Sequence, residues 1–223
     1  MRTQASALLI GALSFWLVNA AHAQTVTFNF DTSTPALTLG QNVPLDQTAG
    51  GVNAHFSSPQ GAAFSVQTDV STVHTLSQFS GHYLNPNNGN RNALDILFGQ
   101  SLTNISLTFA TAENTAAGEL TTPILLTAFL NSTNTPAIGS ASATPVFSVT
   151  DTYPSGTLTF GSLQPFNLVE IRVPTGGGGG IATDFLVDNV TVGIVPEPSS
   201  VALFGVALGL LSLRTLARRR RRA

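Results

Sequence analysis

The chain contains no cysteine, and its middle part has very few basic residues. Without cysteine, no disulfide stabilises the fold and no thiolate serves as a nucleophile or a metal ligand. Between Gln24 and Val195 the basic side chains, histidine aside, are Arg91 and Arg172. Ten acidic residues outnumber them, which gives this stretch a formal charge of −8. A surface with this charge cannot neutralise phosphates, so nucleic acid is excluded as a partner.

The same stretch also lacks an amphipathic helical pattern. Its apolar residues alternate with polar ones, as in TVTFNF (Thr25–Phe30) and NISLTF (Asn104–Phe109), and this period of two is typical of strands. Clusters of Asn, Gly and Pro separate the runs and indicate turns. We therefore predict an all-β domain over residues 24–194, an antiparallel β-sandwich of jelly-roll type, with no second domain.

The N-terminus has the three parts of a secretory signal peptide. Arg2 supplies the basic start, the apolar run Ala7–Val18 follows, and Ala21-His22-Ala23 precedes Gln24. These features predict a signal peptide over residues 1–23, export through the Sec translocon, and cleavage by signal peptidase before Gln24. The alternative is an uncleaved membrane anchor, for which the apolar run is short.

The C-terminus combines an apolar segment with a run of arginines. Val201–Ala217 is 17 residues long and contains one charged residue, Arg214. This length makes about 25 Å of helix, near the lower limit for a bilayer span, and predicts a transmembrane helix over about residues 199–217. The positive-inside rule then places the run of arginines in the cytoplasm and residues 24–195 on the far side of the membrane. The run consists of Arg218, Arg219, Arg220, Arg221 and Arg222. A solvated basic tail is the alternative.

A short motif made of Val195, Pro196, Glu197 and Pro198 precedes the apolar segment. The order of Pro-Glu-Pro, apolar helix and arginine cluster resembles the PEP-CTERM sorting signal of Gram-negative envelope proteins. The resemblance covers residues 195–223 and implies that the motif is recognised by exosortase, a membrane cysteine protease-transpeptidase. It implies a precursor tethered in the inner membrane, then a protein of the outer cell surface or extracellular matrix, in the context of exopolysaccharide and biofilm.

One expected strand contains a change of phase. In DFLVDNVTV (Asp184–Val192) the apolar face switches at Asp188-Asn189, which predicts a β-bulge or a bend. Asp188 is then expected to be semi-buried, on the face that carries Leu186 and Val190. A buried carboxylate needs hydrogen bonds, a partner charge or a metal ion. The sequence leaves all three open.

A second resemblance concerns the first and last expected strands. The stretches FNFD (Phe28–Asp31) and FLVDNVTV (Phe185–Val192) are similar to the corresponding strands of galactose-binding-like jelly rolls. Many carbohydrate-binding modules have that fold, often with a structural calcium ion held by oxygen ligands. The resemblance implies a calcium site in this chain. Its candidate ligands are Asp31, Asp184 and Asp188.

The residues needed for catalysis are hard to find in the sequence. His74 and His82 are eight residues apart, which fits no standard metal motif, and G-x-S-x-G is missing. We therefore predict a protein that is not an enzyme, with a structural or glycan-binding role and with extracellular polysaccharide as a partner. Tyr83 and Tyr153 are candidate sugar-stacking residues, and each is equally suited to covering the core.

A secreted hydrolase that acts on envelope or extracellular polysaccharide is the alternative function. A cleft that holds two close carboxylates favours the hydrolase, because glycoside hydrolysis uses such a pair. A flat sandwich rimmed by loops favours the binding protein.

Overall fold

The computed structural model describes residues 24–32, 34–68, 75–87, 93–111, 123–174 and 184–195. The expected signal peptide, Pro196–Pro198, the expected membrane span and the arginine cluster lie outside these ranges, so what was expected of them stays a prediction. Within the described ranges, no helix is long and apolar enough to cross a membrane. Residues Thr25–Val195 form one compact unit.

In the part of the chain that is described, ten strands make up a single sheet. They are β1 (Gln24–Phe28), β2 (Leu45–Ala49), β3 (Val52–Ser57), β4 (Phe64–Thr68), β5 (His82–Pro86), β6 (Ala93–Thr111), β7 (Ile124–Phe129), β8 (Gly139–Ala143), β9 (Ser155–Arg172) and β10 (Phe185–Ile194). Their order is β4-β5-β10-β6-β9-β7-β8, with β1 paired to β10 and the β2–β3 hairpin joined to β6 through β3. The pairs among β2 to β10 are antiparallel, which confirms the all-β, antiparallel prediction.

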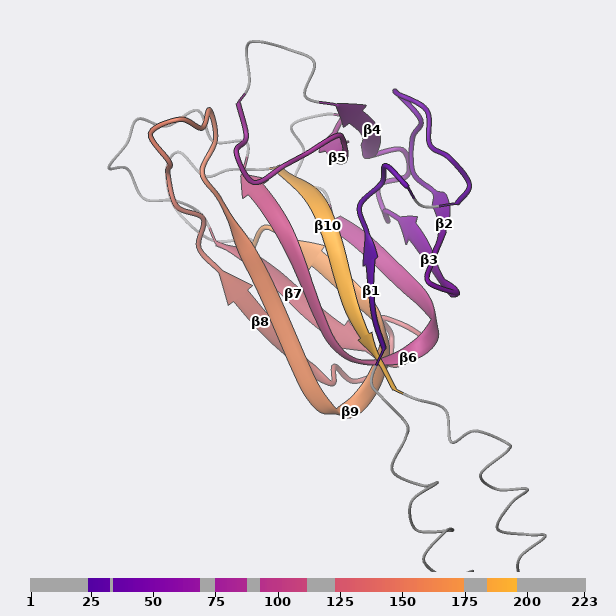
Figure 1. Ribbon diagram of the computed structural model, residues 1–223. Coiled ribbons are helices and arrows are strands. Elements are labelled where there is room, and N and C mark those ends of the chain that lie inside the picture. The colour runs from indigo at the N-terminus through magenta and orange to yellow at the C-terminus, as the bar shows by residue number, and fades with distance from the viewer. Residues whose placement is uncertain are drawn as a thin grey trace, which may run out of the picture. The chain divides into compact units, whose positions relative to one another are not determined.

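The two longest strands, β6 and β9, fold the sheet onto itself. Their pairing shifts in register between Leu97 and Leu102 and again before Asn104. Figure 1 shows both strands turning near their middles, so that their two halves lie in different layers. Alternate residues are buried in both halves of β6, as two facing layers require. These residues are Leu94, Ile96, Phe98, Ile105, Leu107 and Phe109.

Phenylalanine rings fill the space between the layers. The Phe28 ring centroid lies 6.0 Å from those of Phe56 and Phe98, and the Phe64 and Phe185 centroids are 5.3 Å apart. All five side chains are at most 1% exposed. Each buried phenylalanine stabilises the fold by about 2 kcal/mol. The apolar core therefore supplies stability that disulfides cannot supply in a chain without cysteine.

The predicted bulge in the last strand is confirmed, with one correction. The pairing of β10 with β6 shifts in register between Asp188 and Thr191, and Asn189 has a φ of 50°. The bulge brings Val190 into the main core together with Val187. Asp188 therefore shares a face with Leu186 but not with Val190, and it is fully buried instead of semi-buried.

A second, smaller cluster of apolar side chains lies on the opposite face of β10. It consists of Leu76, Phe79, Tyr83, Ala110 and Leu186, with Tyr153 packed against it. The rings of Tyr83 and Phe79 meet edge to face with centroids 5.5 Å apart. The two tyrosines therefore pack against this cluster, which is the second of the two roles considered for them.

Candidate functional site

A pocket of about 540 Å³ lies on the outward face of β2, β3 and β6. The register places its side chains in two rows across the strands. Asp46 faces His55, and His55 faces Leu97, in the first row. Thr48 faces Asn53 in the second row. Because successive side chains of a strand point to opposite faces, these residues point outward while Leu45, Ala54 and Phe56 are buried in the core.

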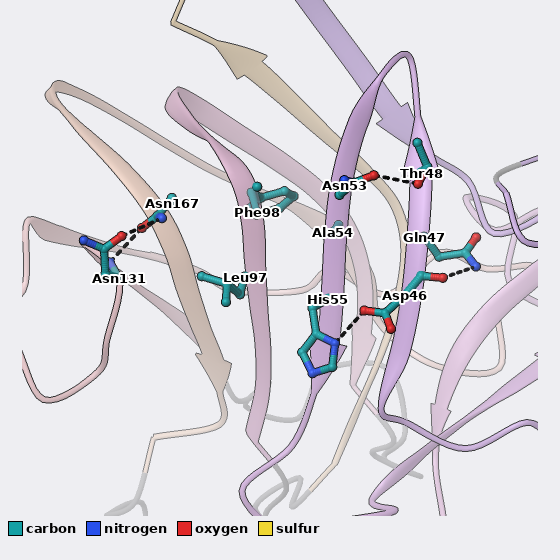
Figure 2. Close-up of a pocket in the computed structure, with 11 residues that line it drawn as sticks. Asp46, Gln47, Thr48, Asn53, Ala54, His55, Leu97, Phe98, Asn131 and Asn167 are labelled. Carbon is teal, nitrogen blue, oxygen red and sulfur yellow. Dashed lines mark hydrogen bonds and ion pairs between the residues drawn. The ribbon is translucent and has the colours of Figure 1, made fainter.

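Hydrogen bonds hold the polar side chains of the pocket in pairs. His55 Nδ1 lies 2.7 Å from Asp46 Oδ1, and Thr48 Oγ1 donates to Asn53 Oδ1 at 2.7 Å. At the other end, Asn131 N donates to Asn167 Oδ1 at 2.7 Å, and Asn167 Nδ2 donates to Asn131 Oδ1 at 2.9 Å. Figure 2 shows Leu97 between the asparagine pair and His55. The pairing limits the rotamers of these side chains, so the pocket wall is largely pre-formed.

These pairs leave hydrogen-bonding groups unused. Among the residues described, no protein group bonds to Asp46 Oδ2 or to the side-chain amino groups of Asn53 and Asn131. A carboxylate oxygen accepts, and an amide amino group donates two hydrogen bonds. The pocket therefore offers both donors and acceptors to a ligand.

The floor of the pocket is apolar and hollow. Leu97 is 39% exposed, the side chain of Phe98 is buried, and Gly99 contributes no side chain. A Cβ atom at Gly99 would find its nearest neighbour, Asn53 Cβ, at 3.5 Å, which is ordinary contact distance. Gly99 thus leaves real space next to Asn53.

Two further carboxylates lie on the same sheet but do not line the pocket. Asp95 of β6 faces Glu170 of β9 directly across the strands. Burial, and to a smaller degree the Glu170 charge, raises the pKa of Asp95 to about 6. Asp95 Oδ1 is buried and has no hydrogen-bond partner among the described residues, whereas Glu170 Oε1 lies 3.3 Å from Arg172 Nε.

Asp31 and Asp188, two of the candidate calcium ligands, bind backbone N–H groups at the first residue of β5 and in the turn before it. Asp31 Oδ1 accepts a hydrogen bond from His82 N at 2.7 Å, and Asp188 Oδ2 accepts one from Ser80 N at 3.1 Å. Asp188 also accepts hydrogen bonds from the backbone and side-chain amides of Asn189, at 2.7 and 3.0 Å. Burial is the main cause that raises the pKa of Asp188 to about 6. The Asp31 charge adds to it, while the bonds from Ser80 and Asn189 oppose it.

The third candidate ligand, Asp184, lies elsewhere. It is four residues before Asp188 in nearly extended chain, so the two are about 13 Å apart along the chain. Calcium needs six to eight oxygens at 2.3–2.6 Å, and the part of the chain that is described contains no group of three acidic or histidine side chains placed for a metal. Amide N–H groups already bind both Asp188 oxygens. Hydrogen bonding therefore accounts for the buried carboxylate of Asp188, and a calcium ion held by these aspartates stays a prediction.

The remaining residues singled out in the sequence contribute little to the pocket. Val195 ends the described unit, and its backbone N donates to Ser101 O at 2.9 Å. Ala21, Ala23, His74 and Pro196–Pro198 lie outside the described residues. Sequence reasoning missed the pocket itself, because polar residues at alternate strand positions are the usual pattern of any solvent-facing sheet.

Comparison with known proteins identifies carbohydrate-binding modules as structural neighbours. No family model and no curated protein matches the sequence. A family 6 module is 16% identical, with a TM-score of 0.35 and coverage of 62% of this chain and 87% of that chain. A family 35 module from Clostridium thermocellum is 18% identical, with a TM-score of 0.33 and coverage of 67% and 97%. A family 6 module from Clostridium stercorarium, solved with cellobiose, is 14% identical, with a TM-score of 0.33 and coverage of 62% and 92%. Identities and TM-scores this low leave function to be inferred from this chain's own side chains.

Proposed function

We propose that the β-sandwich is a non-catalytic module that binds extracellular polysaccharide in the pocket over β2, β3 and β6. The observation that carries this proposal is the set of unused donors and acceptors around the exposed apolar surface of Leu97. Sugars present hydroxyl groups at their edges and C–H groups on their ring faces, so they need both kinds of surface. Of the described residues that line the pocket, Asp46 alone carries a carboxylate, which supports binding over hydrolysis.

The proposal includes export and sorting, for which the support is the sequence of the two termini. The Sec translocon and signal peptidase would act on residues 1–23, and the inner membrane would hold the apolar segment before exosortase recognises Val195–Pro198. The mature protein would then reach the outer cell surface or extracellular matrix, within exopolysaccharide or biofilm. Replacing Pro196, Glu197 and Pro198 by alanine should leave secretion intact and block processing in a host with the matching exosortase. An unchanged mature mass would reduce the motif to a linker.

A secreted hydrolase stays the second candidate because of Asp95 and Glu170. Residues directly opposite each other on antiparallel strands have Cβ atoms about 5 Å apart, which suits the carboxyl pair of a retaining glycosidase. The raised pKa of Asp95 suits a general acid. Against this reading, Asp95 Oδ1 is buried and the pair does not line the pocket.

The experiment is a polysaccharide screen of purified residues 24–195, read for both retention and cleavage. We expect retention without cleavage. Gly99→Val should reduce retention because its side chain fills the pocket, and valine suits a strand. Gly161→Val is the matched control, since a Cβ atom there is 3.8 Å from its nearest neighbour and Gly161 does not line the pocket. Equal retention by both variants would place any binding elsewhere, and cleavage that is lost in Asp95→Asn would favour the hydrolase.

A further inference from the structure

The charges around the pocket indicate which sugars it takes. Among the described residues that line it, Asp46 is the one acidic residue, with a side chain that is 82% exposed, and none is a lysine or an arginine. Arg172, on β9, does not line the pocket and is already paired with Glu170. Anionic sugars would therefore meet no lysine or arginine in the described wall of the pocket, and Asp46 would repel them.

The hydrogen-bonding groups at the Asp46 end are mainly acceptors. A His55 ring that carries its single proton on Nδ1 donates to Asp46 Oδ1, 2.7 Å away, and presents its second nitrogen, Nε2, as an acceptor. Asp46 Oδ2 is a second acceptor with no partner in the part of the chain that is described. A ligand group with several N–H donors and a positive charge matches this pair of acceptors, and an ammonium group has three such donors.

Negative charge outside the pocket also favours a cationic ligand over an anionic one. Asp95 lies on β6 two residues from Leu97, so its side chain is on the same outward face of the sheet. Glu170 faces Asp95 from β9. The two acids therefore form the next row of outward side chains beside His55 and Leu97. Residues 24–195 carry a formal charge of −8. This field raises the local concentration of cations and lowers that of anions.

From these observations we propose that the pocket prefers a cationic amino sugar, a deacetylated hexosamine whose ammonium group binds Asp46. The inference rests on the function proposed above, because it names the substrate class of that same pocket. The inference concerns a single charged contact, between the ammonium group and Asp46, at the end of the pocket formed by β2 and β3. The asparagine pair at the other end, Asn131 and Asn167, would bind hydroxyl groups of the neighbouring sugar units whatever their charge.

The test compares three probes on residues 24–195, the unit that contains the whole described core. They are a glucosamine oligosaccharide, its N-acetylated counterpart, and an oligouronate, each in EDTA so that no metal bridges acid to acid. We expect the glucosamine probe to bind most tightly and its affinity to fall with added salt. Asp46→Asn should lower that affinity about fivefold, as for an exposed ion pair, and leave the N-acetylated probe unaffected, since asparagine keeps an acceptor oxygen.

Asp151→Asn is the control variant, because it changes the net charge equally and lies outside the pocket. It should leave the affinity for glucosamine unchanged. Tighter binding of the N-acetylated or uronate probe, or an Asp46→Asn variant that binds glucosamine as well as the wild type, would overturn this inference and leave glycan binding standing. No retention of any probe, with circular dichroism showing folded protein, would overturn both proposals.

Discussion

Two carboxyl groups with the same raised pKa, Asp188 fully buried and Asp95 partly buried, have opposite surroundings. Asp188 accepts hydrogen bonds from Ser80 and Asn189, whereas Asp95 Oδ1 has no partner among the described residues. In both, the pKa rises from 3.8 to about 6 in the folded chain. A raised pKa means that the folded chain binds the proton more tightly than the unfolded chain does. The contribution of this proton to the free energy of unfolding is therefore fully present below about pH 4 and is lost as the pH rises through 6.

Asp95→Asn should therefore stabilise the domain at neutral pH. Asparagine resembles the protonated acid and removes the cost of ionising a partly buried group next to Glu170, so we expect a gain of about 2 kcal/mol in the free energy of unfolding at pH 7.5. Near pH 4 the gain should vanish. Urea unfolding at the two pH values measures it. Asp188→Asn is the contrasting variant and should cost about 1–2 kcal/mol at pH 7.5, because an acceptor of amide hydrogen bonds is lost. A gain from Asp95→Asn that is the same at both pH values would contradict the assignment.

Gly81 occupies a position where both backbone and space demand glycine. Its φ is +65°, and a Cβ atom would collide with the carboxylate of Asp31. Gly51 has a similar φ of +81° but no atom within 4 Å of such a Cβ. We expect Gly51→Ala to cost about 1 kcal/mol through its backbone alone, and Gly81→Ala to cost clearly more. Thermal unfolding of the two variants compares the costs, and equal losses would mean that Asp31 moves away freely.

At the scale of elements, residues 75–82 are held by three acidic side chains from distant parts of the chain. Asp151 accepts hydrogen bonds from Ser77 N and Ser77 Oγ, at 2.8 and 2.9 Å. Asp188 and Asp31 hold the following residues, Ser80 and His82. The segment covers Leu186 and the small apolar cluster on that face of β10. These three carboxylates thus fix a loop in a chain that has no cysteine for a disulfide.

Asp151→Ala should loosen this segment without unfolding the sandwich. Two hydrogen bonds to Ser77 are lost, and we expect faster amide exchange at residues 76–80 and a loss of about 1–2 kcal/mol. Asp151→Asn keeps one acceptor oxygen and should show a smaller effect. Hydrogen exchange read residue by residue distinguishes the outcomes. Unchanged exchange at residues 76–80 would show that Asp151 does not hold the segment.

The strands and the bulge could be predicted from sequence because each depends on local alternation. The period of two in NISLTF marks the buried positions of β6, and the change of phase at Asp188-Asn189 marks the bulge of β10. The partner of Asp188 could not be predicted, because Ser80 is 108 residues away in the chain. The pocket depends on the register between β3 and β6, and on a contact between Asn131 and Asn167, neither of which leaves a local signal.

At the scale of the whole molecule, packing and hydrogen bonds account for the contacts that the described residues make. Because amides bind the Asp188 carboxylate and Asp184 lies far from it, we expect the melting temperature of residues 24–195 to be the same in calcium and in EDTA. A bound ion would stabilise the native state by about 2.7 kcal/mol at 100 times its dissociation constant. A melting temperature that rises steadily with calcium in the wild type but not in Asp31→Asn would contradict this expectation and show that calcium binds at Asp31.

The central claim is that the outward face of β2, β3 and β6 is the glycan-binding surface of this protein. Residue-resolved NMR of residues 24–195, titrated with the glucosamine oligosaccharide and its N-acetylated counterpart, tests it most directly. We predict that amide shifts concentrate at Asp46–Thr48, Asn53–His55 and Leu97–Gly99, with Asn131 and Asn167 at the far end of the pocket. Shifts that concentrate at the turn Ser80–His82, or that are missing while the protein is retained on the same glycan, would contradict the claim.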